Sequence, residues 1–121
     1  MNEYKAEFID LHSLKDAHQE ITTIGSDPKS IDIMAPKAVH KNIRLHNIIG
    51  QDAIIIKQDM LSIGGDVAIP KNAFHLDQSP VTILLIGSLA QLHLLVKKLN
   101  RHYPRIQHIA QEIKDLLIQV K

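Results

Sequence analysis

The chain has 121 residues, enough for one domain with its own core, and we expect residues 1–121 to form a single domain. Lys and Arg number 14 against 13 acidic residues, so the net charge of +1 offers no long-range attraction for nucleic acid or an acidic membrane surface. Cysteine is absent, which excludes disulfides, thiolate nucleophiles and cysteine metal sites and fits a reducing environment.

No run approaches the roughly 18 apolar residues of a membrane span, and the N-terminus lacks a basic region followed by an apolar stretch. We therefore expect a soluble, cytoplasmic protein with neither nucleic acid nor a membrane as a partner. Aromatic residues make up only 3% of the chain, so its core should be aliphatic.

The first third of the chain predicts strand, helix and strand. Residues 5–11, Lys-Ala-Glu-Phe-Ile-Asp-Leu, suit a strand. Ser13 is a suitable N-cap and Gly25 a left-handed stop, so a helix is expected between them. Residues 31–34 then predict a short strand, which Pro36 ends.

The middle third predicts strand, helix and strand. Residues 42–46 alternate as a half-buried strand would. Three successive isoleucines in residues 51–63 would also suit a strand, but the apolar spacing favours a helix capped by Gly64. Residues 67–69 predict another strand, followed by a polar loop over residues 71–80.

The last third predicts a strand and two helices. Residues 81–86 are almost wholly apolar, as expected of a central strand covered on both faces. Gly87 and Ser88 lead into a third helix, and Pro104 starts a fourth. The predicted order is β-α-β-β-α-β-β-α-α, a two-layer α/β (α+β) fold with helices packed on a mixed sheet. A split βαβ arrangement is favoured, ferredoxin-like with extra C-terminal helices.

Polar residues gather around the end of the second predicted helix more densely than folding alone requires. Lys57, Gln58, Asp59, Ser62 and Asp66 concentrate charge and hydrogen-bonding capacity around one turn. No Ser-His-Asp or Cys-His set can be assembled from spacing, so no catalytic residue is assigned. The candidate ligand-binding residues are Lys37, Lys57, Gln58, Asp59, Ser62, Gly64, Gly65, Asp66, Gly87 and Ser88.

Each candidate also has an interpretation in terms of folding. Gly64 and Gly65 could suggest a phosphate loop, but they follow a helix instead of preceding one, which favours a cap and turn. Ser88, between a strand and a helix, could bind a small anion or could simply cap the helix. Lys37 and Lys57 could pair with an acid or a ligand carboxylate, or could cover apolar surface with their stems.

Eight histidines raise the possibility of a metal site. No two of them lie three or four residues apart on one helix, and no thiolate is available to complete a zinc site. Surface or packed histidines are the favoured interpretation, and the sequence predicts neither a metal nor a cofactor.

Three segments, residues 31–38, 56–68 and 82–91, resemble the N-terminal extension that precedes the barrel in some bacterial and archaeal dihydropteroate synthases. The resemblance runs roughly from the first helix into the last. In that family the following (β/α)8 barrel joins a pterin diphosphate to p-aminobenzoate, and this chain ends where such a barrel would begin. Nothing here resembles the barrel's Asn-Val-Thr-Pro-Asp-Ser-Phe-Ser stretch, and Asp59 and Asp66 stand where glutamate often appears. Synthase catalysis is therefore not implied.

Three hypotheses follow. The leading one is a non-catalytic accessory or oligomerisation domain of folate and pterin metabolism, which acts through a homo-oligomer or through contact with a dihydropteroate synthase-type barrel. The alternative is a protein that binds a pterin or small anion, or a minor enzyme, using Lys37, Lys57, Asp59 and Asp66. A purely structural module is the third hypothesis, because every motif residue also has a folding explanation.

Overall fold

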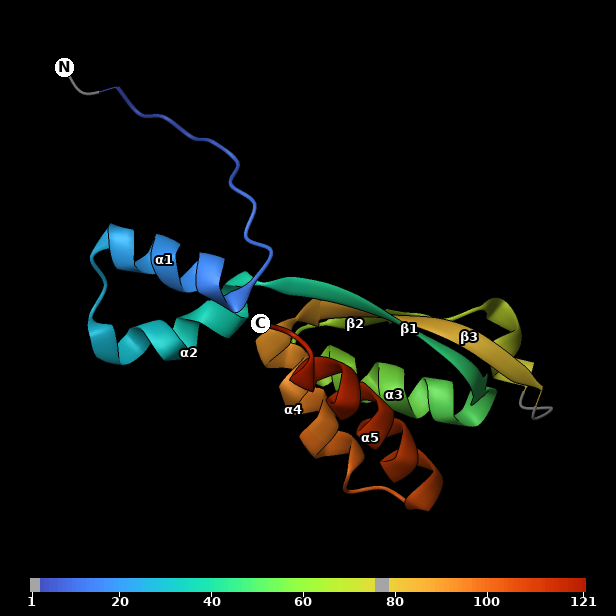
Figure 1. Cartoon of the computed structure of the whole chain (residues 1–121). Coiled ribbons are helices and arrows are strands. Elements are labelled where there is room, and N and C mark those ends of the chain that lie inside the picture. The colour runs from blue at the N-terminus through green and yellow to red at the C-terminus, as the bar shows by residue number, and fades with distance from the viewer. Residues whose placement is uncertain (1–2, 76–78) are drawn as a thin grey trace.

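The computed structural model describes residues 3–75 and 79–121. In this part of the chain, five helices pack on one three-stranded antiparallel sheet, which confirms the α+β class (Figure 1). The predicted mixed sheet and the predicted element order are wrong in detail. The elements are α1 (Leu14–Ile24), α2 (Pro28–Ala38), β1 (His40–Ile49), α3 (Gly50–Ser62), β2 (Asp66–Ala68), the 3-10 helix η1 (Lys71–His75), β3 (Pro80–Ser88), α4 (Leu89–Leu99) and α5 (Pro104–Ile118).

The sheet has the order β1-β3-β2. Both outer strands pair antiparallel with β3, with Leu45 opposite Ile83 and Val67 opposite Leu85. The outer strands therefore run parallel to each other, and α3 connects them. This is a split βαβ arrangement, as expected, but it is built from β1, α3, β2 and β3 and not from the N-terminal elements that predicted it.

The first helix agrees with its sequence signals. The hydroxyl of Ser13 accepts a hydrogen bond from the Asp16 amide at 3.0 Å. Gly25 ends α1 in the left-handed region at φ 90°. The helices predicted over residues 51–63 and after Ser88 and Pro104 are likewise confirmed as α3, α4 and α5.

The strand predicted over residues 31–34 is wrong, because these residues lie inside α2. Asp27 caps this helix by accepting a hydrogen bond from the Lys29 amide at 2.9 Å, and Pro28 occupies its first turn. Ile31 and Ala35 then form its buried face. Pro36 lies within the last turn, where a missing amide disturbs the helix less than it would at the centre.

The strand predicted over residues 5–11 is also wrong for the isolated chain. Within the part of the chain that the structure describes, residues 3–12 form neither helix nor strand and extend away from the domain (Figure 1). A strand needs a neighbour for its amides and carbonyls, and no strand lies beside this segment in the described structure. Residues 1 and 2 belong to the N-terminus in which no signal-like pattern is expected, and they lie outside the described residues.

β1 is longer than the predicted strand over residues 42–46 and contains a bulge between Leu45 and Ile48. Both of these residues are buried. In a regular strand, two residues three positions apart would face opposite sides of the sheet. The bulge restores the alternation, and Asn47 within it has φ 62°. Asparagine tolerates this left-handed conformation better than most residues do.

β3 is the central strand, as expected, but helices cover only one of its faces. Val81, Ile83 and Leu85 are buried, whereas Thr82 and Ile86 on the opposite face are exposed. The predicted coverage on both faces is therefore wrong. In the polar loop predicted over residues 71–80, the first five residues form η1, and residues 76–78 lie outside the described residues.

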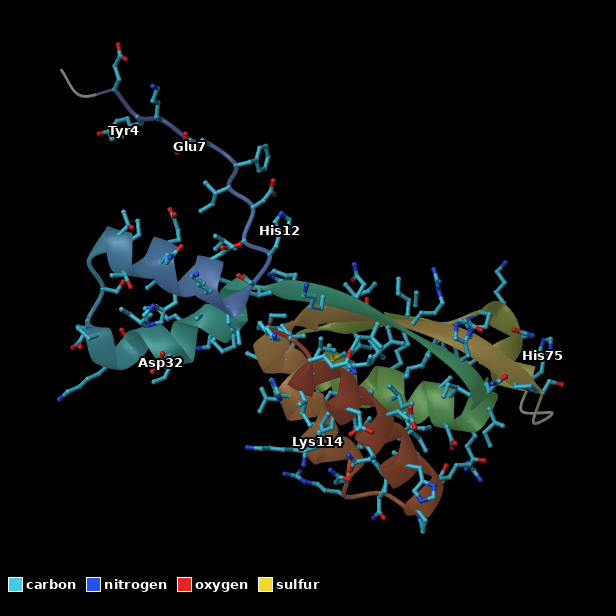
Figure 2. All side chains as sticks on the ribbon, in the orientation of Figure 1. Tyr4, Glu7, His12, Asp32, His75 and Lys114 are labelled. Atoms are coloured by element: carbon cyan, nitrogen blue, oxygen red, sulfur yellow. The ribbon has the colours of Figure 1, made fainter. Side chains whose placement is uncertain are left out.

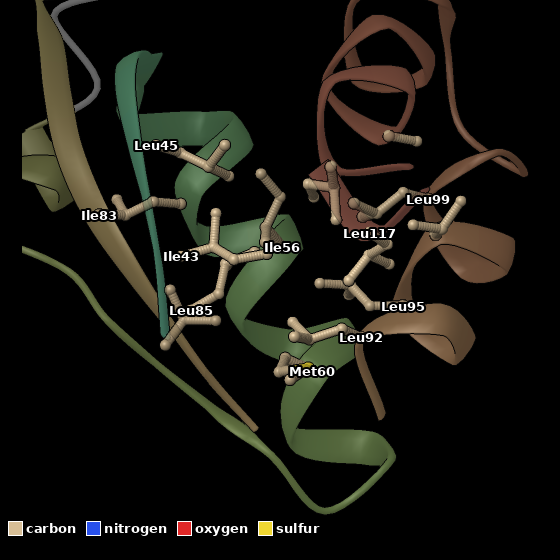
Figure 3. Close-up of a cluster of buried hydrophobic side chains, with 14 of the residues drawn as sticks. Ile43, Leu45, Ile56, Met60, Ile83, Leu85, Leu92, Leu95, Leu99 and Leu117 are labelled. Carbon is tan, nitrogen blue, oxygen red and sulfur yellow. The ribbon is translucent and has the colours of Figure 1, made fainter. Parts of the chain in front are cut away.

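The core lies between the inner face of the sheet and helices α3, α4 and α5 (Figure 3). It is aliphatic, as expected. The core side chains labelled in Figure 3 are Ile43, Leu45, Ile56, Met60, Ile83, Leu85, Leu92, Leu95, Leu99 and Leu117.

No helix among residues 3–75 and 79–121 has the length and apolar character needed to cross a lipid bilayer.

Gly50→Ala should destabilise the fold where η1 packs against the start of α3. A β-carbon at Gly50 would lie 2.1 Å from the carbonyl oxygen of Ala73, so the two backbones would have to separate. We expect a loss of roughly 1–3 kcal/mol in the free energy of unfolding, measured by urea denaturation. The exposed neighbour Gln51 gives the control Gln51→Ala, which should change stability little. Equal stability of both variants would contradict this close approach.

Candidate functional site

Lys57 joins α3 to β2. Its ammonium donates hydrogen bonds to the Asp66 carboxylate at 3.0 Å and to the Val67 carbonyl at 2.7 Å. The same carboxylate oxygen accepts a hydrogen bond from the Val67 amide at 2.7 Å. The hydrogen bond from Lys57, with that from the backbone, lowers the pKa of Asp66. These two candidate residues therefore hold a helix and a strand together.

Gly64 and Gly65 form the cap that the sequence favours. The Gly64 amide donates to the Leu61 carbonyl and the Gly65 amide to the Met60 carbonyl, each at 3.1 Å. With Gly64 at φ 92°, this is the Schellman pattern of a helix end. A β-carbon at Gly65 would lie 2.9 Å from the Ile86 carbonyl oxygen, so there is no room for a side chain at this position either.

Ser88 caps α4 through a reciprocal pair of hydrogen bonds with Gln91. Its hydroxyl accepts from the Gln91 amide at 3.2 Å, and its own amide donates to the Gln91 side chain at 2.9 Å. A β-carbon at Gly87 would lie 2.5 Å from the terminal carbon of Met60. An anion at this helix start would compete with Gln91, and anion binding here stays a prediction.

The remaining candidates lie on other surfaces. The Asp59 carboxylate lies 2.8 Å from His102 Nε2, and Ser62 donates to the Asp59 carbonyl at 2.6 Å and accepts from Lys98. Gln58 is exposed on α3 and Lys37 is exposed in the last turn of α2.

The structure thus brings Lys57 and Asp66 together but does not gather all four residues of the small-ligand hypothesis. Asp59 pairs with His102 instead, and Lys37 belongs to a different helix. Whether any of the ten candidates binds a ligand stays a prediction.

A groove that the sequence did not predict lies between β1 and α5. Its volume is about 710 Å³. One wall is the bulged half of β1 and the other is a face of α5, so the bulge at Asn47 shapes the opening. The residues that line it are Arg44, Leu45, His46, Asn47, Ile48, Ile49, Asp52, Arg105, His108, Ile109, Gln111, Glu112 and Leu116.

A buried carboxylate is among the groups that line this groove. Asp52 is 1% exposed, and its two oxygens accept hydrogen bonds from Arg105 Nε at 2.5 Å and Arg105 Nη2 at 3.0 Å. The Tyr103 hydroxyl also donates to it. The Arg105 guanidinium lies 4.9 Å from the centre of the Tyr103 ring, which adds a cation–π contact. The three side chains tie the start of α3 to the start of α5.

Burial alone would raise the pKa of Asp52, but hydrogen bonds from Arg105 and Tyr103 and the charge of Arg105 outweigh it, and the pKa lies below its usual value. Burial and the neighbouring Asp52 carboxylate raise the pKa of Tyr103. The hydrogen bond to Asp52 raises the pKa of Arg105. At neutral pH the cluster is therefore an ion pair with a neutral tyrosine and not a poised acid–base pair.

The sequence carries no local sign of this cluster. Asp52 lies in the first turn of a predicted helix. An acidic residue is common there because it interacts favourably with the helix dipole, so its presence does not indicate a buried ion pair. Arg105 follows 53 positions later, directly after the predicted helix start at Pro104. Only the tertiary fold, which brings the start of α5 to the start of α3, joins them. In the described residues, no group of three or more His, Asp or Glu side chains is arranged to hold a metal ion.

Comparison with known proteins links the chain to part of a larger enzyme. It is 30% identical over 105 residues to a bifunctional dihydropteroate synthase/dihydropteroate reductase of Helicobacter pylori (strain ATCC 700392 / 26695). The matched region is 87% of this chain but only 27% of that protein. No family model and no solved structure matches the chain. The chain is thus similar to a minor part of a dihydropteroate synthase-containing protein, which supports a relation to that family. That the matched part is the N-terminal extension stays a prediction.

Asp52→Asn should lower the free energy of unfolding by roughly 1–3 kcal/mol at neutral pH, because a neutral amide replaces a buried carboxylate that accepts three hydrogen bonds. The pKa of Asp52 is lower in the folded state than its value near 3.8 in the unfolded state. The ionised carboxylate therefore stabilises the fold above pH 3.8, and this stabilisation is lost as the pH falls through the pKa of the folded state. The difference from wild type in urea denaturation should shrink between about pH 6 and about pH 3.

Asp32→Asn is the control for this measurement, since the Asp32 side chain is 90% exposed. It should change stability little at either pH. An Asp52→Asn effect of the same size at both pH values would contradict a stabilising carboxylate.

Proposed function

We propose that this chain is a non-catalytic accessory domain of folate and pterin metabolism, which acts by self-association and by contact with a dihydropteroate synthase-type barrel. The match to the bifunctional protein carries this proposal. It spans most of this chain but 27% of that protein, so most of the length available for the two named activities lies outside the matched region.

The use of polar residues supports an accessory role. Lys57 is bonded to Asp66 and Val67, and Ser88 to Gln91, in contacts that hold helices to strands or cap them. A nucleophile or general base needs a partner positioned toward a substrate. Five of the residues predicted to bind a ligand instead direct their polar groups at other parts of the same chain, namely Lys57, Asp59, Ser62, Asp66 and Ser88.

The uncovered face of the sheet is the surface that we assign to the barrel. Helices α3, α4 and α5 cover the other face (Figure 1). At the centre of the uncovered face lie Leu84 and Ile86, of which Ile86 is 42% exposed, beside the exposed Ala68. Arg44 and Asp66 lie opposite them on the neighbouring strands. An apolar centre with a charged rim is the usual composition of a protein interface.

Ile86→Lys should weaken binding to the dihydropteroate synthase of the source organism by at least roughly tenfold, because a charge would be buried at the centre of the interface. Binding of the purified proteins can be measured by isothermal titration calorimetry. Leu94→Lys is the matched control, since Leu94 is 47% exposed on α4, and it should bind like wild type. Absence of binding by wild type, or equal loss in both variants, would refute this docking surface.

Binding of a pterin or small anion is the second candidate function, and the groove beside β1 favours it. Arg44, Arg105 and His108 supply positive or potentially positive groups to a hollow of about 710 Å³. These are not the four residues, Lys37, Lys57, Asp59 and Asp66, that the sequence suggested.

Pterin, folate and inorganic phosphate can each be tested by thermal shift, where a ligand at 100 times its dissociation constant adds about 2.7 kcal/mol of stability. A shift that His108→Ala abolishes would place the ligand in the groove, and a shift that Lys57→Met abolishes would place it at the joint between α3 and β2. No shift with any of the three compounds would refute this second candidate.

A further inference from the structure

We propose that residues 5–11 of one copy of this chain add as an extra strand to the free edge of β1 of a second copy, inside the groove between β1 and α5. The exchange is reciprocal and gives a closed two-fold dimer. This inference rests on the self-association part of the proposed function and not on binding to the barrel. It uses the edge of the sheet, whereas the barrel is assigned to the uncovered face.

The N-terminal segment has the composition of a strand but no partner. Tyr4 is 97% exposed, Phe8 104% and Ile9 53%. The chain has only two Phe and two Tyr residues. Phe8 belongs to residues 5–11 and Tyr4 directly precedes them, so two of these four side chains lie here in full contact with solvent (Figure 2). Large apolar side chains gathered on one exposed segment mark a surface that is buried in another state.

The point where the segment leaves the domain is fixed. Ser13 caps α1, and the Leu14 amide donates to the Lys121 carbonyl at 2.9 Å. Lys41 at the start of β1 donates to the His12 carbonyl at 3.4 Å. From there the segment runs outward, away from the sheet (Figures 1 and 2). A second copy can offer the groove without breaking any of these contacts.

β1 offers an edge for the added strand. In the described sheet it pairs only with β3, so the backbone groups on its far side have no strand beside them. Two hollows of about 710 and 490 Å³ adjoin this edge, and Leu116 of α5 lines both. The smaller hollow is also lined by His12 and Ser13 of the same copy and by residues 119–121. Together they follow β1 from Lys41 to Ile49.

The dimensions and charges agree. Seven extended residues span about 23 Å, and the ten residues of β1 span about 33 Å, so the whole segment fits along the edge. Residues 5–11 contain two acidic side chains and one lysine. The hollows present Lys41, Arg44 and Arg105, and Arg105 retains half of its surface exposed although it pairs with Asp52. Strand addition combines backbone pairing with such side-chain complementarity.

Reciprocal exchange gives a closed two-fold dimer. Each copy has one segment and one β1 edge, so two copies that exchange their segments satisfy each other and leave no open β1 edge for further growth. The added strand would also cover the longest exposed edge of the described sheet, which natural proteins protect against uncontrolled pairing.

The test is the oligomeric state of the full chain by sedimentation velocity. Wild type should sediment as a dimer, whereas Phe8→Asp on the segment and Leu116→Lys in the groove should each weaken the dimer at least tenfold. Both residues are exposed, so circular dichroism should show an unchanged fold. Ile24→Asp is the matched control, since Ile24 is 74% exposed on α1 and lies outside the groove, and it should remain dimeric.

Engineered cysteines give a direct second measurement, because the chain contains none. When the Ile9→Cys variant is mixed with the Gln111→Cys variant, the two should form disulfide-linked pairs. As a control, a mixture of the Ile9→Cys and Ser30→Cys variants should not. A monomeric wild type, a dimer that withstands both Phe8→Asp and Leu116→Lys, or no cross-link to position 111 would overturn the proposal. If Phe8→Asp is monomeric yet still binds the synthase, strand exchange and barrel docking are separate properties.

Discussion

The close approach of α3 to the sheet at Met60 is the constraint on which the rest of the arrangement depends. Met60 is fully buried, and a β-carbon at either Gly65 or Gly87 would lie 2.5 Å from its terminal carbon. The glycines belong to segments far apart in sequence, one before β2 and one at the end of β3. The absence of both side chains leaves room for a flexible thioether where helix and strands meet. The helix can therefore return its chain as β2 beside β3, which completes the split βαβ unit.

Polar contacts reinforce the same joint. Lys57 holds α3 to β2, and the Gln91 side chain both caps α4 and donates to the Ile63 carbonyl at the end of α3 at 3.4 Å. The dense polar cluster noted in the sequence therefore has a structural use that requires no ligand. A segment can stand out in a sequence because several elements meet there, and such a junction needs caps, turns and paired charges as much as a binding site does.

The surfaces that remain for function are the parts of the sheet that helices leave open. Its outer face presents Leu84 and Ile86, and its β1 edge adjoins the groove that Arg105 and α5 complete. A domain that uses one surface for a neighbouring enzyme and the other for a second copy would connect two enzyme molecules. The proposed connection of this role with folate metabolism rests on the similarity to 27% of a bifunctional dihydropteroate synthase/dihydropteroate reductase.

The sequence alone determined α1, α3, α4 and α5, because caps such as Ser13 and Gly64 act within a few residues, but it missed α2 although Asp27 and Pro28 mark its start. It also indicated the strands with clear alternation and the capping use of Ser88. Tertiary structure decided what depends on distant neighbours: the pairing of Asp52 with Arg105, the bulge at Asn47 and the groove beside β1. The segment over residues 5–11 shows the physical reason most clearly. Its composition suits a strand, but a strand exists only where another strand supplies its hydrogen bonds, and that partner is specified by the whole fold and not by the segment.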